Sequence, residues 1–561
     1  MFIRTIPYQK KSTDSSGQII QAKKVQIVEN KREGSKVIQK IIRHLGVAHN
    51  DEEVCKLKEL GQWIISEQIC KKSLPLYTVE ELTKVRIKSQ KEKEEKLLVN
   101  LRNLREEKKV NIGIEQVYGK LFDELGFIQS FENPSRKRSQ IKVLKDIVLA
   151  RLSNPVSKRK SQEILETEHG KKYSLDKIYR MLEKLDDQTI ERIKNISSEN
   201  TKKLFKEKLD VMFFDVTTLY FESFTEDELK KNGYSKDLKF NQPQVLLSLL
   251  ITKQGMPVDY EVYPGNEYEG NLLIPSLNKL KEKHSIDKVI LVADSGILNQ
   301  ANIEALNQMG IEYIMGARVK SSTQEIKEKI LNRDLYKVEN DNLSIQEIKL
   351  EETPNKRLIV THKKTREKKD KIEREKAIDK LKVKLEKNKN IKNFISNYGY
   401  KKYLTSISDT KVEINQEKLK EEEKWDGIIG IVTNTKLSNQ EVVEQYGKLW
   451  EVEAAFRVTK HDLKIRPIYH WKEQKIKAHI CICFIAYTLF RHLNYRLELI
   501  SKSDTMSFDE ISTHLNRTEL TIVKDVSTSM RYAIPSKLSS VGGKIYRSIN
   551  LKYNFIPFKI S

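Results

Sequence analysis

Cysteine is scarce in this sequence, with four residues among 561: Cys55, Cys70, Cys481 and Cys483. They show neither C-x-x-C pairs nor the Cys/His spacing of a zinc site, and they are too few to cross-link a chain of this length. We therefore expect a protein of a reducing compartment that has no structural zinc.

Long apolar runs and nucleotide-binding loops are also missing. The first residues, MFIRTIPYQKK, lack the apolar centre of a signal peptide. The longest apolar run, AHICICFIAYTLF from Ala478, is shorter than the roughly 20 residues that a membrane span needs. We expect this run to form a buried helix and the protein to have no membrane partner. No G-x-x-x-x-G-K-[ST] loop occurs, which argues against an ATP-driven helicase or motor.

Positive charge is abundant. Lys and Arg number 103 against 79 Asp and Glu, so the formal net charge is +24. Such an excess attracts polyanions and makes nucleic acid the leading partner. A Lys-rich proteome could produce the same count, so charge alone leaves the partner open. At about 150 residues per domain, the length predicts roughly three to four domains.

The first 205 residues divide into two regions. In residues 1–50, KKVQIVE and KVIQKII flank the turn-forming NKREGS, which predicts a small β-rich module. Residues 51–205 have helical patterns, including the charged stretch SQKEKEEKLLVNLRNLREEKK at 89–109, and we expect this region to bind DNA ends. One helix after the N-cap Ser174 has an apolar face, which favours an ordinary core helix over a recognition helix. Its apolar residues are Leu175, Ile178, Met181, Leu182 and Leu185.

The centre of the chain alternates strands and helices. Strands are predicted at KLDVMFFDVTTLYF, QVLLSLLITKQ and PVDYEVYPG, followed by helix GNLLIPSLNKLKEKH, strand DKVILVAD, helix ANIEALNQMG closed by Gly310, and strand IEYIMGA. This β-β-β-α-β-α-β order is that of an α/β fold with an RNase H-like core. We assign the core to residues 206–318 and 437–495.

The alternation stops between the two parts of the core. Residues 319–436 contain the strand patterns RLIVTHK, KKYLTSI and WDGIIGIVTN around a highly charged run at 363–390, which predicts a β-rich insertion with one solvated helix. A DNA-facing role for that helix is the minority interpretation. Residues 496–561 form a C-terminal region.

Three acidic side chains stand out in the core. Asp215 lies among apolar neighbours, where an unpaired carboxylate is costly, and therefore needs a partner. Asp294 ends the strand pattern VILVAD, where parallel strands present catalytic groups, although an acid there can also cap a turn. Glu453 lies in a predicted helix over 437–460, on one face with Tyr446, Trp450, Arg457 and Lys460.

A helix packed beside the two strands would bring these carboxylates together. Clustered carboxylates repel unless cations neutralise them, and hard oxygen ligands favour Mg²⁺ or Mn²⁺ over zinc. Two such ions can activate a water or a 3′-hydroxyl and stabilise the leaving oxygen in phosphodiester displacement. A salt-bridged surface helix would show the same spacing around Glu453, so the prediction depends on all three segments together.

At these residues the sequence resembles bacterial insertion-sequence transposases of the DDE class, in the branch with a Y-(2)-R-(3)-E-(6)-K signature. The resemblance runs from about Val211 to Leu489. Tyr446, Glu453 and Lys460 match the signature, while DVTTLYF and VADSG carry the two aspartates. Leu449 stands where the signature has arginine, a place that Lys448 or Arg457 could fill.

The resemblance implies metal-dependent cleavage at terminal inverted repeats and strand transfer into target DNA, with a hairpin intermediate left open. Asp215, Asp294 and Glu453 would be the catalytic and metal-binding residues. The DNA-binding residues would be Tyr446, Lys448, Arg457 and Lys460. The partners implied are double-stranded DNA and a second subunit on paired DNA ends, and the location is the cytoplasm, at the bacterial nucleoid.

An aromatic side chain that stacks on a flipped base would suit a hairpin step. Trp425 and Trp450 are candidates, but we expect a core role for each. Two other functions stay open: a related two-metal nuclease or recombinase, and an inactive, domesticated DNA-binding protein. Inverted repeats just outside the coding region would separate a transposase from both.

Overall fold

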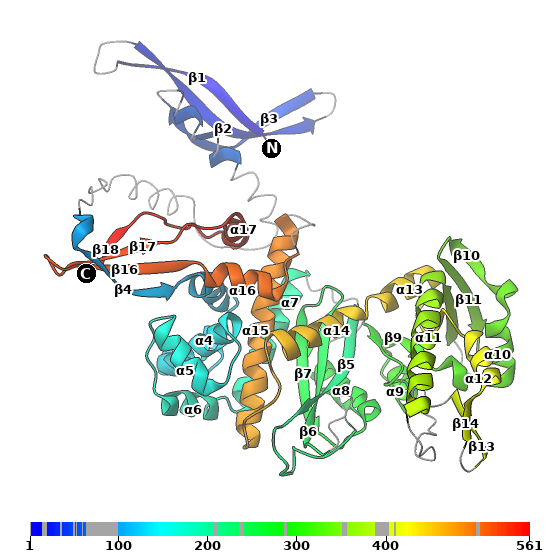
Figure 1. Cartoon of the computed structure of the whole chain (residues 1–561). Coiled ribbons are helices and arrows are strands. Elements are labelled where there is room, and N and C mark those ends of the chain that lie inside the picture. The colour runs from blue at the N-terminus through cyan, green and yellow to red at the C-terminus, as the bar shows by residue number, and fades with distance from the viewer. Residues whose placement is uncertain are drawn as a thin grey trace. The chain divides into compact units, whose positions relative to one another are not determined.

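The computed structural model describes most of the chain. The described residues are 2–13, 19–33, 36–48, 51–62 without 52, 56 and 59, 99–205, 211–234, 241–284, 289–350, 356–387, 403–408, 411–500 and 505–560. The chain divides into two compact units, Met1–Leu98 and Val99–Ser561 (Figure 1). Cys70 and the helical pattern expected over 63–98 lie outside the described residues.

The first unit contains a three-stranded antiparallel sheet in the order β1-β2-β3. Its strands are β1 (Phe2–Thr13), β2 (Ile19–Glu33) and β3 (Lys36–Ala48). Val25, Ile27 and Val28 of β2 are fully buried. The hairpin predicted from KKVQIVE and KVIQKII is confirmed, because Glu33 pairs with Lys36 across the turn.

The second unit is built on a nine-stranded sheet in the order β10-β11-β12-β15-β9-β8-β5-β6-β7. Its first strands in the chain are β5 (Val211–Tyr220), β6 (Gln244–Thr252), β7 (Pro257–Pro264), β8 (Ile290–Ala293) and β9 (Glu312–Ala317). β5, β8 and β9 are parallel, whereas β6 and β7 continue antiparallel from β5. Helices α8 (Leu273–His284) and α9 (Gln300–Gln308) complete the predicted β-β-β-α-β-α-β series.

Four strands among the described residues of 319–436 extend this sheet, and two others form a separate hairpin. β15 (Ile428–Thr433) pairs with β9, and β12 (Arg357–Lys363), β11 (Leu343–Lys349) and β10 (Lys337–Asn340) follow outward. β13 (Leu404–Ser408) and β14 (Lys411–Ile414) form a small hairpin. The charged run is helix α11 (Lys364–Lys387), largely exposed as predicted, and α10 (Gln324–Leu331) and α12 (Gln416–Glu423) flank the strands.

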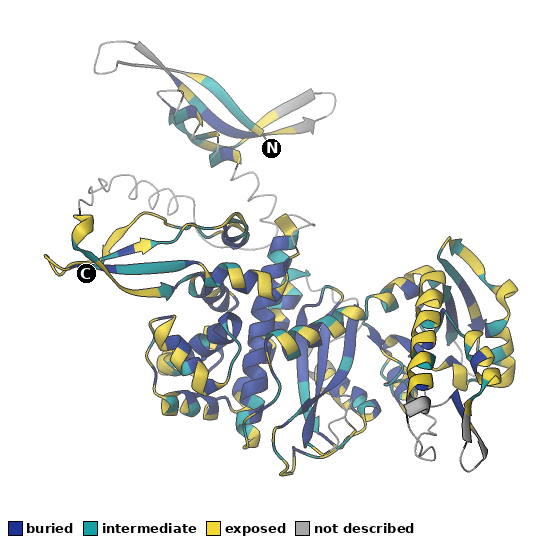
Figure 2. Cartoon of the chain, viewed as in Figure 1, coloured by how far each residue is buried: buried dark blue, intermediate teal, exposed yellow. Residues whose placement is uncertain are grey.

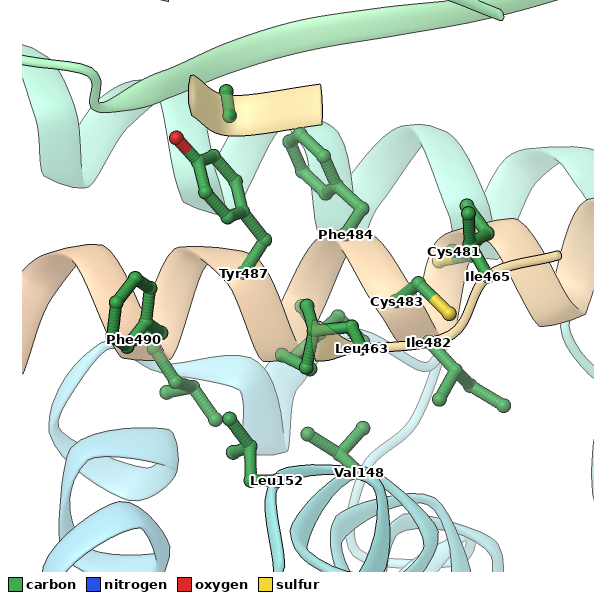
Figure 3. Packing of buried hydrophobic residues seen from close by; sticks show 14 of the residues in the cluster. Val148, Leu152, Leu463, Ile465, Cys481, Ile482, Cys483, Phe484, Tyr487 and Phe490 are labelled. Carbon is green, nitrogen blue, oxygen red and sulfur yellow. The ribbon is translucent and has the colours of Figure 1, made fainter. Parts of the chain in front are cut away.

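A long helix, α15 (Glu473–Ile500), forms the centre of the helical part (Figure 3). It packs against α4, α6 and α7, and Figure 2 shows it mainly dark blue, the colour of buried residues. The surrounding helices are α3 (Lys120–Glu124), α4 (Arg138–Ser153), α5 (Lys158–Thr167), α6 (Leu175–Glu183) and α7 (Asp187–Leu204).

The buried helix predicted for the run from Ala478 is confirmed. Within the described residues, α15 is long and apolar enough to cross a membrane by length and composition, but 89% of the apolar window is buried inside the protein. The free thiols Cys481 and Cys483 lie in this buried stretch. α15 is therefore the core helix of the second unit.

Helix α6 also has the predicted core role. The Ser174 hydroxyl accepts a hydrogen bond from the backbone N of Lys177 and caps the helix. Ile178, Met181 and Leu182 are buried in the main core. Leu185 is buried in the same core, and Leu175 is half-buried.

One part of the predicted helical stretch at 89–109 is wrong. Residues Leu104–Asn111 form strand β4, which pairs antiparallel with β16 (Glu519–Asp525). Most of β4 is exposed, so its Glu and Lys residues stay solvated at a sheet edge, and long-range pairing overrides their helical preference. The resulting sheet has the order β18-β17-β16-β4.

The C-terminal region thus shares a sheet with a segment from the predicted helical region. It contains α16 (Phe508–Asn516), β17 (Arg531–Pro535), α17 (Ser540–Ser548) and β18 (Phe558–Ile560). α17 packs against α15 and α16. Residues 104–111 and 519–560 therefore fold together.

Candidate active site

The two aspartates occupy matching places on neighbouring parallel strands. Phe214 of β5 pairs with Ala293 of β8, and Asp215 and Asp294 are the next residues. Neighbouring parallel strands lie about 4.8 Å apart. The register therefore sets Asp215 and Asp294 side by side at the carboxyl end of β8.

Both aspartates belong to the same face of the sheet. Side chains alternate along a strand, so each aspartate shares a face with the residue two positions earlier. Those residues are Phe213 and Val292, and both belong to the core that also contains the helices around α15. The intervening Phe214 belongs to the core on the opposite face.

Two short helices cover the face that carries the aspartates. α13 (Asn439–Gly447) packs on β8, β9 and β15, and α14 (Trp450–Arg457) packs on β5 and β6. Val442 of α13 and Val452 of α14 are fully buried in this core. Glu453 follows Val452 and is exposed. The packing of α14 therefore brings Glu453 to the same side of the sheet as Asp215 and Asp294.

The single helix expected over 437–460 is wrong. α13 ends at Gly447, and the backbone N atoms of Lys448 and Leu449 bond to carbonyls three residues earlier, at 3.0 Å each. A wider π-helical turn, η10 (Val458–Asp462), follows α14. Glycine has a low helix propensity, and a tight turn followed by a wide one changes the helical phase. Trp450, Glu453 and Arg457 lie together on α14, whereas Tyr446 belongs to α13 and Lys460 to η10.

Tyr446 joins the carboxylates despite this break. Burial and the adjacent Asp294 and Glu453 carboxylates raise the pKa of Tyr446, while Arg366 opposes them. The phenol therefore stays protonated at neutral pH and is a hydrogen-bond donor. Tyr446, Asp294 and Glu453 thus share one electrostatic environment.

Gly316 makes room for the Tyr446 hydroxyl. Met315 of β9 pairs with Ala293, so Gly316 is the strand neighbour of Asp294. A Cβ atom at Gly316 would overlap the Tyr446 hydroxyl and approach the backbone N of Ser295 to 2.9 Å. The sequence analysis did not select Gly316, although a glycine inside a strand is a known signal of close approach.

The carboxylates have the donor chemistry of a divalent-cation site. The Oδ1 atom of Asp215 accepts a hydrogen bond from the backbone N of Val216 at 2.8 Å, and Asp294 accepts one from Ser295 at 2.7 Å. These bonds orient the two side chains. Hard oxygen donors suit Mg²⁺ or Mn²⁺. Among the described residues, no group of three acidic, His or Cys side chains already has the spacing to hold a metal ion.

The predicted DNA-binding cations have different surroundings. The Lys448 Nζ forms a salt bridge to Glu444 Oε1 at 2.7 Å. Arg457 is exposed and lies within electrostatic range of Asp462, without a salt bridge within the part of the chain that the structure describes. The Lys460 Nζ lies 6.0 Å from the centroid of the Phe456 ring. Arg457 is therefore more available to a phosphate than Lys448.

The residue that replaces the signature arginine packs inward. Leu449 is half-buried against the main core, so an apolar side chain suits this position. Arg366, in the first turn of α11, acts on Tyr446 and was not selected from the sequence. Arg366 lies in the charged run at 363–390. Its closeness to Tyr446 depends on how the strands after β9 extend the sheet, which the local sequence does not show.

The two candidate tryptophans differ. Trp425 packs against the core on the opposite face, with the Lys320 Nζ 5.9 Å from its ring, as its expected core role requires. Trp450 has 57% of its surface exposed, so the core role expected for it is wrong.

Comparison with known proteins identifies the segment that contains these residues. Residues 206–489 match the family of transposase DDE domains. No curated protein matches the chain.

Two solved structures illustrate the range of structural likeness. A piggyBac transposase synaptic complex with hairpin DNA is 10% identical, with a TM-score of 0.38, over 72% of this chain and 76% of that one. A pre-cleavage Mos1 transpososome is 14% identical, with a TM-score of 0.14, over 30% of this chain and 58% of that one.

Proposed function

The chain belongs to the family of transposase DDE domains and is a DNA transposase, and we propose that it cuts DNA at terminal inverted repeats and joins the ends to target DNA. The observation that carries this proposal is the arrangement of Asp215 and Asp294 at matching places on parallel strands. Glu453 lies on the helix that covers the same face. The strands β7-β6-β5-β8-β9 would be an RNase H-like core.

DDE transposases use divalent metal ions. Asp215, Asp294 and Glu453 would hold two Mg²⁺ or Mn²⁺ ions here. When bound, such ions activate a water or 3′-hydroxyl and stabilise the leaving oxygen. The backbone N–H groups of Val216 and Ser295 orient the aspartates, and the protonated Tyr446 adds a donor beside Asp294.

DNA binding follows from the family and from the net charge of +24. We assign Tyr446, Lys448, Arg457 and Lys460 to the DNA near the cut. Residues 51–205 would bind the element's ends, and two subunits would hold paired ends together. The reaction would take place in the cytoplasm, at the bacterial nucleoid.

The test uses purified protein, DNA bearing the flanking inverted repeats, and Mg²⁺ or Ca²⁺. We expect defined 3′-hydroxyl ends with Mg²⁺ only. Glu453→Gln keeps the size of the side chain, so it should bind the ends and fail to cut them, as should Asp215→Asn and Asp294→Asn.

Glu451→Gln is the matched control, because Glu451 lies on the same helix but faces Gly255 and Arg491. It should cut at the parental rate. Parental cutting by Glu453→Gln would remove Glu453 from the site. Cutting without strand transfer would favour a nuclease, and end binding without cutting by the parental protein would favour an inactive DNA-binding protein.

A further inference from the structure

The segment between η10 and α15 presents cations and aromatic rings outward. Leu463, Ile465 and Ile468 are buried, whereas their neighbours in the chain are exposed or half-buried. Two of these neighbours are among the large exposed side chains of the protein: Tyr469 is 63% exposed and Trp471 is 70% exposed. We call the outward residues the outer strip: Lys464, Arg466, Tyr469 and Trp471.

Buried hydrogen bonds hold the backbone of this segment. The Arg151 Nη1 donates to the carbonyl oxygens of Leu463 at 3.2 Å and Lys464 at 3.4 Å. The His479 ring bonds through Nε2 to the carbonyl oxygen of Ile465 at 3.0 Å. Figure 3 shows Leu463 and Ile465 beside α15. The outer strip is therefore held on a rigid support.

The inward neighbour of the two exposed rings is also anchored. His470 lies between Tyr469 and Trp471 and meets the Tyr179 ring edge-on at 6.4 Å between centroids, with the His479 ring at 5.5 Å. With His470 turned inward, the rings on either side of it face solvent. The inward contacts of His470 thus hold the backbone so that the side chains of Tyr469 and Trp471 point to solvent.

The positive charge of the strip comes from Lys464 and Arg466. Arg151 is buried beneath the strip, whereas burial and the neighbouring Arg151 lower the pKa of Lys158 well below its usual value. The Arg466 guanidinium lies 5.5 Å from the centroid of the Tyr220 ring. Aromatic rings combined with cations are the chemistry by which proteins bind unpaired nucleic-acid bases and their phosphates.

The strip is tied to the strand that carries Asp215. The backbone N of Ile468 donates to the carbonyl oxygen of Tyr220, the last residue of β5, at 3.3 Å. Asp215 lies five residues earlier, about 16 Å along the strand at roughly 3.3 Å per residue. That length corresponds to about five stacked nucleotides at roughly 3.4 Å each.

Resting on the proposed function for the identity of the DNA, we propose that the outer strip binds unpaired nucleotides within about five positions of the phosphate that is cut. Trp471 and Tyr469 stack on bases, and Lys464 and Arg466 contact phosphates. The rigid support keeps these groups in place before DNA arrives.

The test measures binding with Ca²⁺, so that no cutting is needed. One DNA carries the inverted repeat with an unpaired tail at the cut end, and the other is fully paired. Trp471→Ala should weaken binding of the tailed DNA by about 5- to 150-fold, the range of one lost base stack, and leave the fully paired DNA unchanged. Trp471→Phe should retain most of the affinity.

Phe555→Ala is the matched control, because Phe555 is 71% exposed and lies in the C-terminal region. It should bind both DNAs as the parent does. 2-Aminopurine placed within about five nucleotides of the cut should be quenched by the parent and not by Trp471→Ala. Unchanged binding of tailed DNA by Trp471→Ala, or an equal loss on both DNAs, would overturn the proposal.

A change in oligomeric state of Trp471→Ala without DNA would also overturn it, by assigning the rings to a protein contact. The result of the tail-binding test does not depend on whether Asp215, Asp294 and Glu453 form the catalytic site. If Glu453→Gln cuts normally, the proposed site fails while tail binding can still stand. If Glu453→Gln is inactive and tail binding is normal in Trp471→Ala, only the present proposal fails.

Discussion

Replacing Gly316 with alanine is expected to disturb the site through Tyr446. The new Cβ would overlap the Tyr446 hydroxyl and lie 2.9 Å from the backbone N of Ser295. Overpacking of this kind costs about 1–3 kcal/mol of folding free energy. Because Gly316 neighbours Asp294, the same displacement should also slow DNA cutting.

A double-mutant cycle separates the cost of the clash with the Tyr446 hydroxyl from the cost of the close approach to the Ser295 backbone. Tyr446→Phe removes the overlapping oxygen and by itself should cost about 1 kcal/mol through a lost hydrogen bond. In the double variant the overlap with the hydroxyl is relieved, so the total cost should fall below the sum of the single costs by about 1 kcal/mol. The approach to Ser295 remains, so relief should be partial.

Urea unfolding followed by circular dichroism supplies the four free energies. Gly447→Ala is the matched control, because nothing lies within 4 Å of a Cβ at that position. It should be neutral or slightly stabilising. Additive costs within about 0.5 kcal/mol, or a neutral Gly316→Ala, would refute the placement of Tyr446 against Gly316.

Three further predictions concern other parts of the protein. Lys194 is buried and forms salt bridges to Glu191 at 2.9 Å, Asp259 at 2.9 Å and Glu261 at 2.6 Å. Lys194→Met should therefore lower the free energy of unfolding in urea by about 3–5 kcal/mol, because it leaves buried carboxylates unpaired. A loss below about 1 kcal/mol would contradict this. Burial, with nearby Lys158 and Arg151, lowers the pKa of His470 to about 4, so the unfolded chain binds the proton more tightly. The contribution of His470 to stability should be complete above about pH 6.5 and fall toward pH 4 by at most about 1.4 kcal/mol per unit. His470→Asn should show a shallower pH dependence in thermal unfolding, and an unchanged slope would exclude this contribution. Arg457→Ala should lower the salt slope of DNA binding by about one unit, and Arg457→Lys should lose cutting more than affinity. Parental cutting by both Arg457 variants would exclude a phosphate contact.

The strands of the core could be predicted because their short apolar, β-branched runs are typical of buried strands. β5 and β8 place Asp215 and Asp294 as the sequence order indicated. The apolar run from Ala478 predicts a buried helix, and it lies within α15.

Other features depend on contacts that the local sequence does not encode. β4 has helix-favouring Glu and Lys residues and becomes a strand because β16 pairs with it. The break after Gly447 divides the expected helix into α13 and α14, and Tyr446 reaches Asp294 because Gly316 leaves space for its hydroxyl. Gly316 and the outer strip could be selected only once the pairing register of β9 and the contact of Ile468 with β5 were known. The sequence alone gives neither.

Metal-specific rescue tests the central claim most directly. Asp294→Cys replaces a hard oxygen ligand with a softer sulfur ligand, which Mn²⁺ accepts better than Mg²⁺. If Asp294 binds the catalytic metal, this variant should bind inverted-repeat DNA, fail to cut it with Mg²⁺ and recover part of the cutting with Mn²⁺. Cutting at the parental rate with Mg²⁺, or an equal absence of cutting with both metals by a variant that still binds DNA, would contradict the account.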